Sequence, residues 1–155
     1  MNINGKQVGT VFISFIFILS GISFAISWDP PTESGEDNTN VLKQPVAHEQ
    51  RLIFVENDVT VLTFFYLEDN SDSIEVRNEV ERLNNEFGEK LLLEEIDISV
   101  YQTFSAEYNI KSVPVILIRG KENINAPIRL EGIQDYAIIK ENICSTYKEQ
   151  PELCD

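Results

Sequence analysis

Apolar positions in this chain occur in continuous runs that predict buried strands. Residues 59–66 (VTVLTFFY) form an almost uninterrupted run of β-branched and aromatic side chains, which is typical of a strand buried on both faces of a sheet. Residues 91–97 (LLLEEID) predict a second strand. Residues 114–118 (PVILI) predict a third, starting at a proline, where a missing N–H costs least. A loop containing Gly120 leads to a short fourth strand near residues 128–131.

Helical spacing appears between these strands. Residues 71–87 carry apolar side chains at intervals of four, three and four along one face. These are Val76, Val80, Leu83 and Phe87. Asp72 and Glu75 resemble a capping box at the start of this helix, and Gly88 fits a left-handed cap at its end.

Three further segments complete the pattern. A short helix starts near Ser99 and Gln102 and ends at Asn109, and a final helix covers residues 134–147. The side chains that this helix is expected to bury are Tyr136, Ile139, Ile143 and Tyr147. Residues 46–56 are ambiguous between helix and strand, with the helix favoured. From residue 59 onward the order is therefore βαβαββα, an α/β layer fold with parallel crossovers followed by a hairpin.

The first 28 residues differ in kind from the rest. Residues 8–28 are uncharged and rich in Ile and Phe, and as a helix they would reach roughly 30 Å, the thickness of a bilayer core. Lys6 precedes this run and acidic residues follow it, which predicts a single-pass membrane anchor with a cytoplasmic N-terminus and an external domain. The alternative is a cleaved secretory signal, because residues 23–25 (SFA) offer small side chains at the spacing that signal peptidase recognises.

Composition limits the rest of the organisation. The chain has 155 residues, of which 43% are hydrophobic, enough for one core. We expect an anchor or signal at 1–28, an acidic proline-containing linker at 29–43, a folded domain at 44–148 and a tail at 149–155. The net charge of −14 disfavours nucleic acid and acidic membrane surfaces as partners, since phosphates require Lys and Arg.

The order of elements, together with the segment YNIKSVPVILIRG at residues 108–120, resembles the thioredoxin-like superfamily. The resemblance covers residues 46–147. It implies a three-layer α/β/α fold with a mixed sheet of four to five strands. It also makes Pro114 the candidate for the proline that follows a cis peptide bond in this family, with Val113 before it.

In register with the thioredoxin loop, this chain lacks the residues of the redox site. The sequence NSDS occupies residues 70–73, so Asn70 and Ser73 stand at the two cysteine positions. Asp69 replaces the usual aromatic residue, and Phe64 stands where the family has a buried acid. Thiol–disulfide exchange requires an attacking thiolate. The chain is therefore predicted to be a degenerate member without redox activity at the usual site.

Other chemistry near this loop is weakly indicated. Ser73 as a nucleophile would need a base, and His48, the only histidine, shows no sign of pairing with it. The acids Glu68, Asp69 and Asp72 could hold a metal ion, but acids are also favoured near a helix N-terminus by its dipole. We expect no catalytic residue, no metal and no cofactor.

The two cysteines, Cys144 and Cys154, lie near the C-terminus. In an oxidising compartment they are expected to form a structural disulfide that fastens the tail to the last helix. The alternative is a reactive pair that relays disulfides from an unusual position. Acidic neighbours such as Glu141 and Glu149 disfavour a thiolate there.

These observations favour a membrane-tethered, extracytoplasmic, non-catalytic module that binds or scaffolds another protein or peptide. The resemblance implies a peptide-binding surface between the former redox loop and the proline. Its candidate residues are Tyr66, Leu67, Asn70, Ser73 and Val113. The alternative is a thiol–disulfide oxidoreductase or redox relay that uses Cys144 and Cys154, and a third reading is a purely structural subunit.

Overall fold

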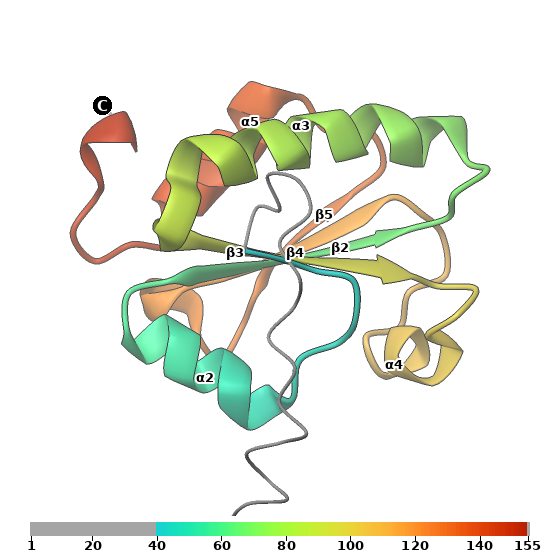
Figure 1. The fold of residues 1–155 in the computed structure, drawn as a ribbon, viewed down its shortest axis with the longest axis horizontal. Coiled ribbons are helices and arrows are strands. Elements are labelled where there is room, and N and C mark those ends of the chain that lie inside the picture. Colours follow the sequence, from blue (N-terminus) through green and yellow to red (C-terminus); the bar gives the residue numbers. More distant parts are fainter. Residues whose placement is uncertain (1–39, 155) are drawn as a thin grey trace, which may run out of the picture. The chain divides into compact units, whose positions relative to one another are not determined.

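The computed structural model describes residues 40–154, which form a five-stranded sheet with helices on both faces (Figure 1). The strands, in sheet order, are β1 (Val41–Leu42), β3 (Leu91–Asp97), β2 (Thr60–Tyr66), β4 (Val115–Arg119) and β5 (Ile128–Glu131). β1, β3 and β2 are parallel, whereas β4 is antiparallel to both of its neighbours. The helices are α2 (His48–Glu56), α3 (Ser71–Phe87), α4 (Gln102–Glu107) and α5 (Tyr136–Cys144).

The alternation of side chains along the central strand divides the core into two layers. Every residue of β2 is buried. Leu62, Phe64 and Tyr66 point toward α3 and α5, in the larger apolar cluster. Val61 and Phe65 point to the opposite face, where they pack with residues of α2 and α4. The mixed sheet, the three layers and the central position of β2 therefore match the expected thioredoxin-like α/β fold.

The folded part begins earlier than expected. Residues 41–42 were assigned to the linker, but they form β1, where Val41 pairs with Leu93 and Leu42 with Glu94. The Leu93 N–H also donates to the carbonyl of Asn40, at 2.9 Å. The exposed edge of β3 offers main-chain donors and acceptors, and this short segment satisfies them. The ambiguous segment after it forms helix α2.

The ends of two helices differ from the prediction. The side chain of Asn70, and not the Asp72 and Glu75 pair, caps α3, because its Oδ1 accepts the Ser73 N–H at 2.8 Å. Asp135 caps α5 in the same way, by accepting from the Ile138 N–H at 2.9 Å. Asn and Asp are favoured at these positions because their short side chains reach the free N–H groups of the first turn.

No helix within residues 40–154 is long and apolar enough to cross a membrane. The membrane anchor or signal sequence predicted at residues 8–28 lies outside the described residues.

Candidate functional site

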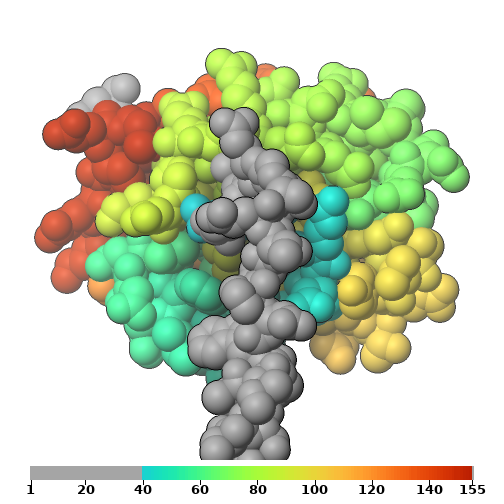
Figure 2. All heavy atoms as spheres, viewed as in Figure 1, coloured from blue at the N-terminus to red at the C-terminus, as the bar shows by residue number. Residues whose placement is uncertain are grey.

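The candidate site lies where three strands meet at one edge of the sheet. Because β2 and β3 are parallel, their carboxyl ends share this edge, and the antiparallel β4 begins there. The Ile98 N–H donates to the carbonyl of Tyr66 at 3.1 Å and so ties the two loops together. In Figure 1 the β2–α3 loop, in light green, and the start of α4, in yellow, lie on the right. Figure 2 shows side chains of the same two segments next to each other at the surface.

The two positions that correspond to redox cysteines shape the loop. Asn70 caps α3. Ser73 is only 1% exposed, and its Oγ accepts the Leu67 N–H at 3.4 Å. His48 is an exposed residue at the start of α2, on the opposite face of the sheet. Ser73 is therefore placed as a buried structural residue, without a base beside it.

The Val113–Pro114 peptide bond is cis, at the position that the resemblance indicated. Pro114 is buried, and its carbonyl accepts the Gly132 N–H at 2.9 Å. Val113 is half-buried against the cluster around Phe65. Among the described residues, its own N–H and carbonyl have no hydrogen-bond partner. The main chain of Val113 therefore carries one donor and one acceptor that no other described residue satisfies.

Tyr66, a candidate residue of the peptide-binding surface, is buried in the structure. It is 7% exposed, and its ring stacks on Phe64 with 5.6 Å between the ring centroids. The guanidinium of Arg77 lies 3.9 Å from the centre of the Tyr66 ring. Burial raises the pKa of the Tyr66 hydroxyl. The last residue of a strand buried on both faces is drawn into the core because the helix that follows covers it.

Exposed apolar side chains occur on three segments that meet this end of the sheet, which the sequence did not predict. Ile74 in the first turn of α3 is 50% exposed, Val100 before α4 is 67% exposed and Ile133 after β5 is 52% exposed. The Gly132 hydrogen bond places Ile133 beside Pro114. Three large apolar side chains from separate elements at one edge form a candidate contact surface.

A buried acid lies close to this edge on the α3 side of the sheet. Glu95 on β3 is buried, and its Oε1 lies 3.7 Å from Nε of Arg77 without a hydrogen bond. Burial raises the pKa of the Glu95 carboxyl, against the opposing effect of Arg77. The prediction found only that Phe64 replaces the family acid. The sequence did contain an indication that Glu95 is buried, because it is a charged residue inside the apolar run 91–97.

The opposite face contains a second polar group, which we did not predict. Arg51 on α2 and Glu94 on β3 are both buried and form an ion pair, with Nε 2.9 Å from Oε2. Glu94 also accepts from the Val46 N–H at 2.8 Å and from the Thr63 hydroxyl at 2.6 Å. Arg51 donates through Nη1 to the Tyr108 hydroxyl at 3.0 Å. This network joins α2, β2, β3 and Tyr108, the residue that follows α4.

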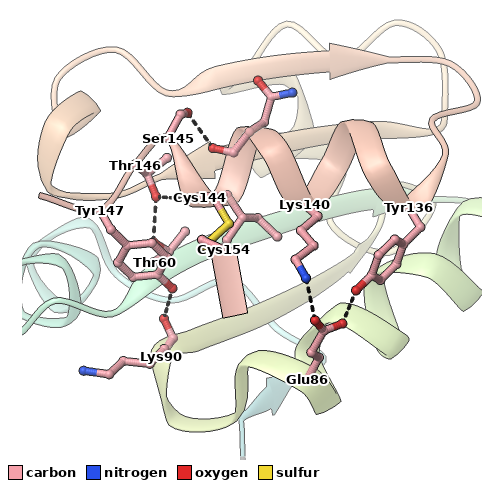
Figure 3. The surroundings of a disulfide bond; sticks show 12 residues. Thr60, Glu86, Lys90, Tyr136, Lys140, Cys144, Ser145, Thr146, Tyr147 and Cys154 are labelled. Carbon is pink, nitrogen blue, oxygen red and sulfur yellow. Dashed lines mark hydrogen bonds and ion pairs between the residues drawn. A yellow bond between two sulfur atoms is a disulfide. The ribbon is translucent and has the colours of Figure 1, made fainter. Parts of the chain in front are cut away.

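Cys144 and Cys154 form a disulfide, as predicted (Figure 3). It joins the end of α5 to a short 3₁₀ turn (Glu152–Cys154). No free cysteine is found among the described residues. Beside it, the Tyr147 hydroxyl donates to the carbonyl of Lys90 at 2.6 Å, and burial raises the pKa of Tyr147 to about 12. The disulfide thus fastens the tail to the apolar layer of α3 and α5.

A metal-binding group is not found among residues 40–154, where no three His, Cys, Asp or Glu side chains come together to hold an ion. Glu68, Asp69 and Asp72 lie in or beside the first turn of α3, where its dipole favours negative charge.

No protein-family model and no curated protein sequence matches this chain. Among solved structures, a mutant thioredoxin from Halobacterium salinarum NRC-1 is 20% identical, with a TM-score of 0.59 over 76% of this chain and 100% of that one. Chloroplastic thioredoxin z is 21% identical, with a TM-score of 0.56 over 68% and 94% of the two chains. Fasciola hepatica thioredoxin is 17% identical, with a TM-score of 0.54 over 70% and 99%. The chain therefore has a thioredoxin-like fold.

Proposed function

We propose that this protein is a non-catalytic thioredoxin-like domain that binds an extended segment of another extracytoplasmic protein at the edge beside Pro114. Residues 8–28 tether it to the cell membrane, with the domain outside. In the alternative form of the proposal these residues are a signal that is cleaved, and the domain is secreted. The observation that carries the proposal is the free main chain of Val113 at an edge with exposed apolar side chains.

An extended segment can add to such an edge as a further strand. Its main chain would pair with the N–H and carbonyl of Val113, while apolar side chains on alternate positions contact Ile74 or Ile133. Leu67 is half-buried beside them and belongs to the same surface. Tyr66 and Ser73 are buried below this surface and support it from the core.

Redox chemistry is not part of this proposal. The loop supplies no sulfur atom, since Asn70 and Ser73 occupy the cysteine positions, and thiol–disulfide exchange needs an attacking thiolate. The two cysteines that exist are bonded to each other at the far end of α5. We therefore expect the full chain to show no insulin reduction above buffer. Activity that disappears with Cys144→Ser would instead favour a redox relay.

The binding proposal is tested by photo-crosslinking in cells that make this protein. A benzoylphenylalanine residue is placed at Ile74 or at Ile133, and in the control chain at Ile53, which is 58% exposed on α2 across the sheet. We expect one shared adduct from the first two positions and none of that mass from the control. Mass spectrometry then identifies the crosslinked segment of the partner.

A matched pair of variants distinguishes specific binding at this edge from nonspecific apolar contact. Ile133→Asp removes apolar surface without touching the core, and it should abolish the adduct formed from position 74. Ile53→Asp makes the same change on the other face and should leave that adduct intact. Equal adducts from all three positions, or an adduct that is insensitive to Ile133→Asp, would contradict binding at this edge.

A further inference from the structure

A small cavity lies on the α2 side of the sheet, away from the edge discussed above. It has a volume of about 10 Å³, which is enough for one species of about the size of a water molecule. It is lined by Arg51, Val61, Thr63, Tyr108, Leu117, Arg119 and Pro127. Two guanidinium groups therefore border a space of this size inside the domain.

Arg119, the last residue of β4, is the unsatisfied member of this group. Its Nε and Nη1 atoms are buried and have no hydrogen-bond partner within residues 40–154. Arg51, in contrast, is neutralised by Glu94 and also bonded to Tyr108. Buried donors on a cation are costly when nothing accepts from them. The Arg119 side chain therefore calls for an acceptor in the cavity.

The other polar groups around the cavity favour an acceptor without protons. The Tyr108 hydroxyl accepts from Arg51, so its own proton is free to be donated. The Thr63 hydroxyl gives its proton to Glu94 and retains only lone pairs toward the cavity. Arg119 and Tyr108 thus offer up to three donors, against one acceptor from Thr63. A water molecule would bring two protons into a site with that single acceptor.

We propose that this cavity binds one monatomic halide ion, chloride under ordinary conditions. The ion accepts from Nε and Nη1 of Arg119 and from the Tyr108 hydroxyl. It neutralises the Arg119 guanidinium, which, unlike Arg51, pairs with no carboxylate in the described part of the chain. Unlike water, a halide ion has no proton that would need an acceptor, and it therefore matches a lining made mainly of hydrogen-bond donors. This proposal does not rest on the proposed function.

Thermal unfolding of the purified full chain tests the proposal. A ligand that binds only the folded state raises the unfolding midpoint with its concentration. Chloride is varied from about 5 to about 300 mM at fixed ionic strength, with gluconate, which is too large for the cavity, as the replacement anion. We expect the midpoint to rise with chloride in the wild type and to be independent of chloride in Arg119→Leu. Lys121→Gln removes an equal charge from an exposed ion pair with Asp58 and should keep the wild-type response.

Tyr108→Phe provides a second variant in case Arg119→Leu does not fold. It removes one donor from the ion and should weaken the chloride response about tenfold in concentration. Crystals soaked in bromide should show an anomalous peak between Arg119 and Tyr108. A midpoint that is equal in chloride and gluconate would overturn the proposal, and so would a water molecule at this position without anomalous signal.

Discussion

The two faces of the sheet are built on different principles. Toward α3 and α5, the core is a continuous apolar layer that includes Leu83 and Phe64. Toward α2 and α4, two smaller apolar clusters flank the buried pair of Arg51 and Glu94. An apolar layer tolerates imprecise packing better than a buried ion pair tolerates the loss of one partner. The sheet is therefore stabilised mainly by apolar packing on one face and by specific polar side-chain pairs on the other.

The largest expected effect comes from breaking the ion pair. Glu94→Gln keeps the shape of the side chain but leaves the Arg51 charge buried without its counterion. We expect the free energy of unfolding to fall by about 4 kcal/mol, measured by urea denaturation of the full chain.

The double variant Arg51→Met with Glu94→Leu serves as the control for that loss. It removes both charges and should recover part of the stability, because apolar residues can replace a buried pair at little cost. The recovery is incomplete because the Val46 N–H and the Thr63 hydroxyl lose their acceptor. Arg51→Met and Glu94→Leu are also measured singly. If their losses simply add in the double variant, Arg51 and Glu94 do not depend on each other, and the contrast between the faces fails.

The apolar face should respond to volume instead. Leu83 is fully buried on α3. Leu83→Ala is expected to cost about 3 kcal/mol, through lost burial and a residual cavity. Leu83→Met, which conserves volume, should cost less than about 1.5 kcal/mol. A loss from Leu83→Met as large as that from Glu94→Gln, in the same urea titration, would show that both faces demand specific partners.

Alkaline pH tests the apolar face through Tyr147. Its folded pKa of about 12 is above the ordinary tyrosine value of about 10, so the unfolded chain loses this proton first as pH rises. The stabilisation is complete below about pH 10 and decreases toward pH 12, by about 1.4 kcal/mol per pH unit. Tyr147→Phe should make unfolding less sensitive to pH in that window. If Tyr147→Phe leaves the pH dependence of the free energy of unfolding unchanged, Tyr147 ionises as readily in the folded state as in the unfolded chain.

The sequence predicted what depends on pattern. Runs of apolar residues located β2 and β3, and helical spacing located α3 between Ser71 and Phe87 with the bounds that the structure has. β1 was missed because two residues carry no periodic signal, and its formation depends on the free edge of β3.

The site was harder to predict, because burial and pairing arise from distant segments. Tyr66 reads equally well as a surface aromatic or as core, and only the packing of Arg77 and Phe64 decides that it is buried. Arg51 and Glu94 are 43 residues apart, and nothing local to either one indicates the other. The exposed Ile74 lies outside the apolar helix face that the pattern predicted.

The smallest expected effect concerns Glu95, an acid that is buried on the α3 side of the sheet. Burial raises its pKa in the fold, so the ionised form is less stable in the folded state than in the unfolded chain. The destabilisation is present above the folded pKa and disappears as pH falls toward the ordinary glutamate value of about 4.3. Glu95→Gln should therefore increase the free energy of unfolding at pH 7. The gain should be less than about 1 kcal/mol, because the nearby Arg77 offsets part of the burial effect and solvent screens this partly exposed site. The gain should vanish near pH 4. A loss at pH 7 would mean that Arg77 and Glu95 stabilise each other, and that the α3 face also depends on a specific pair.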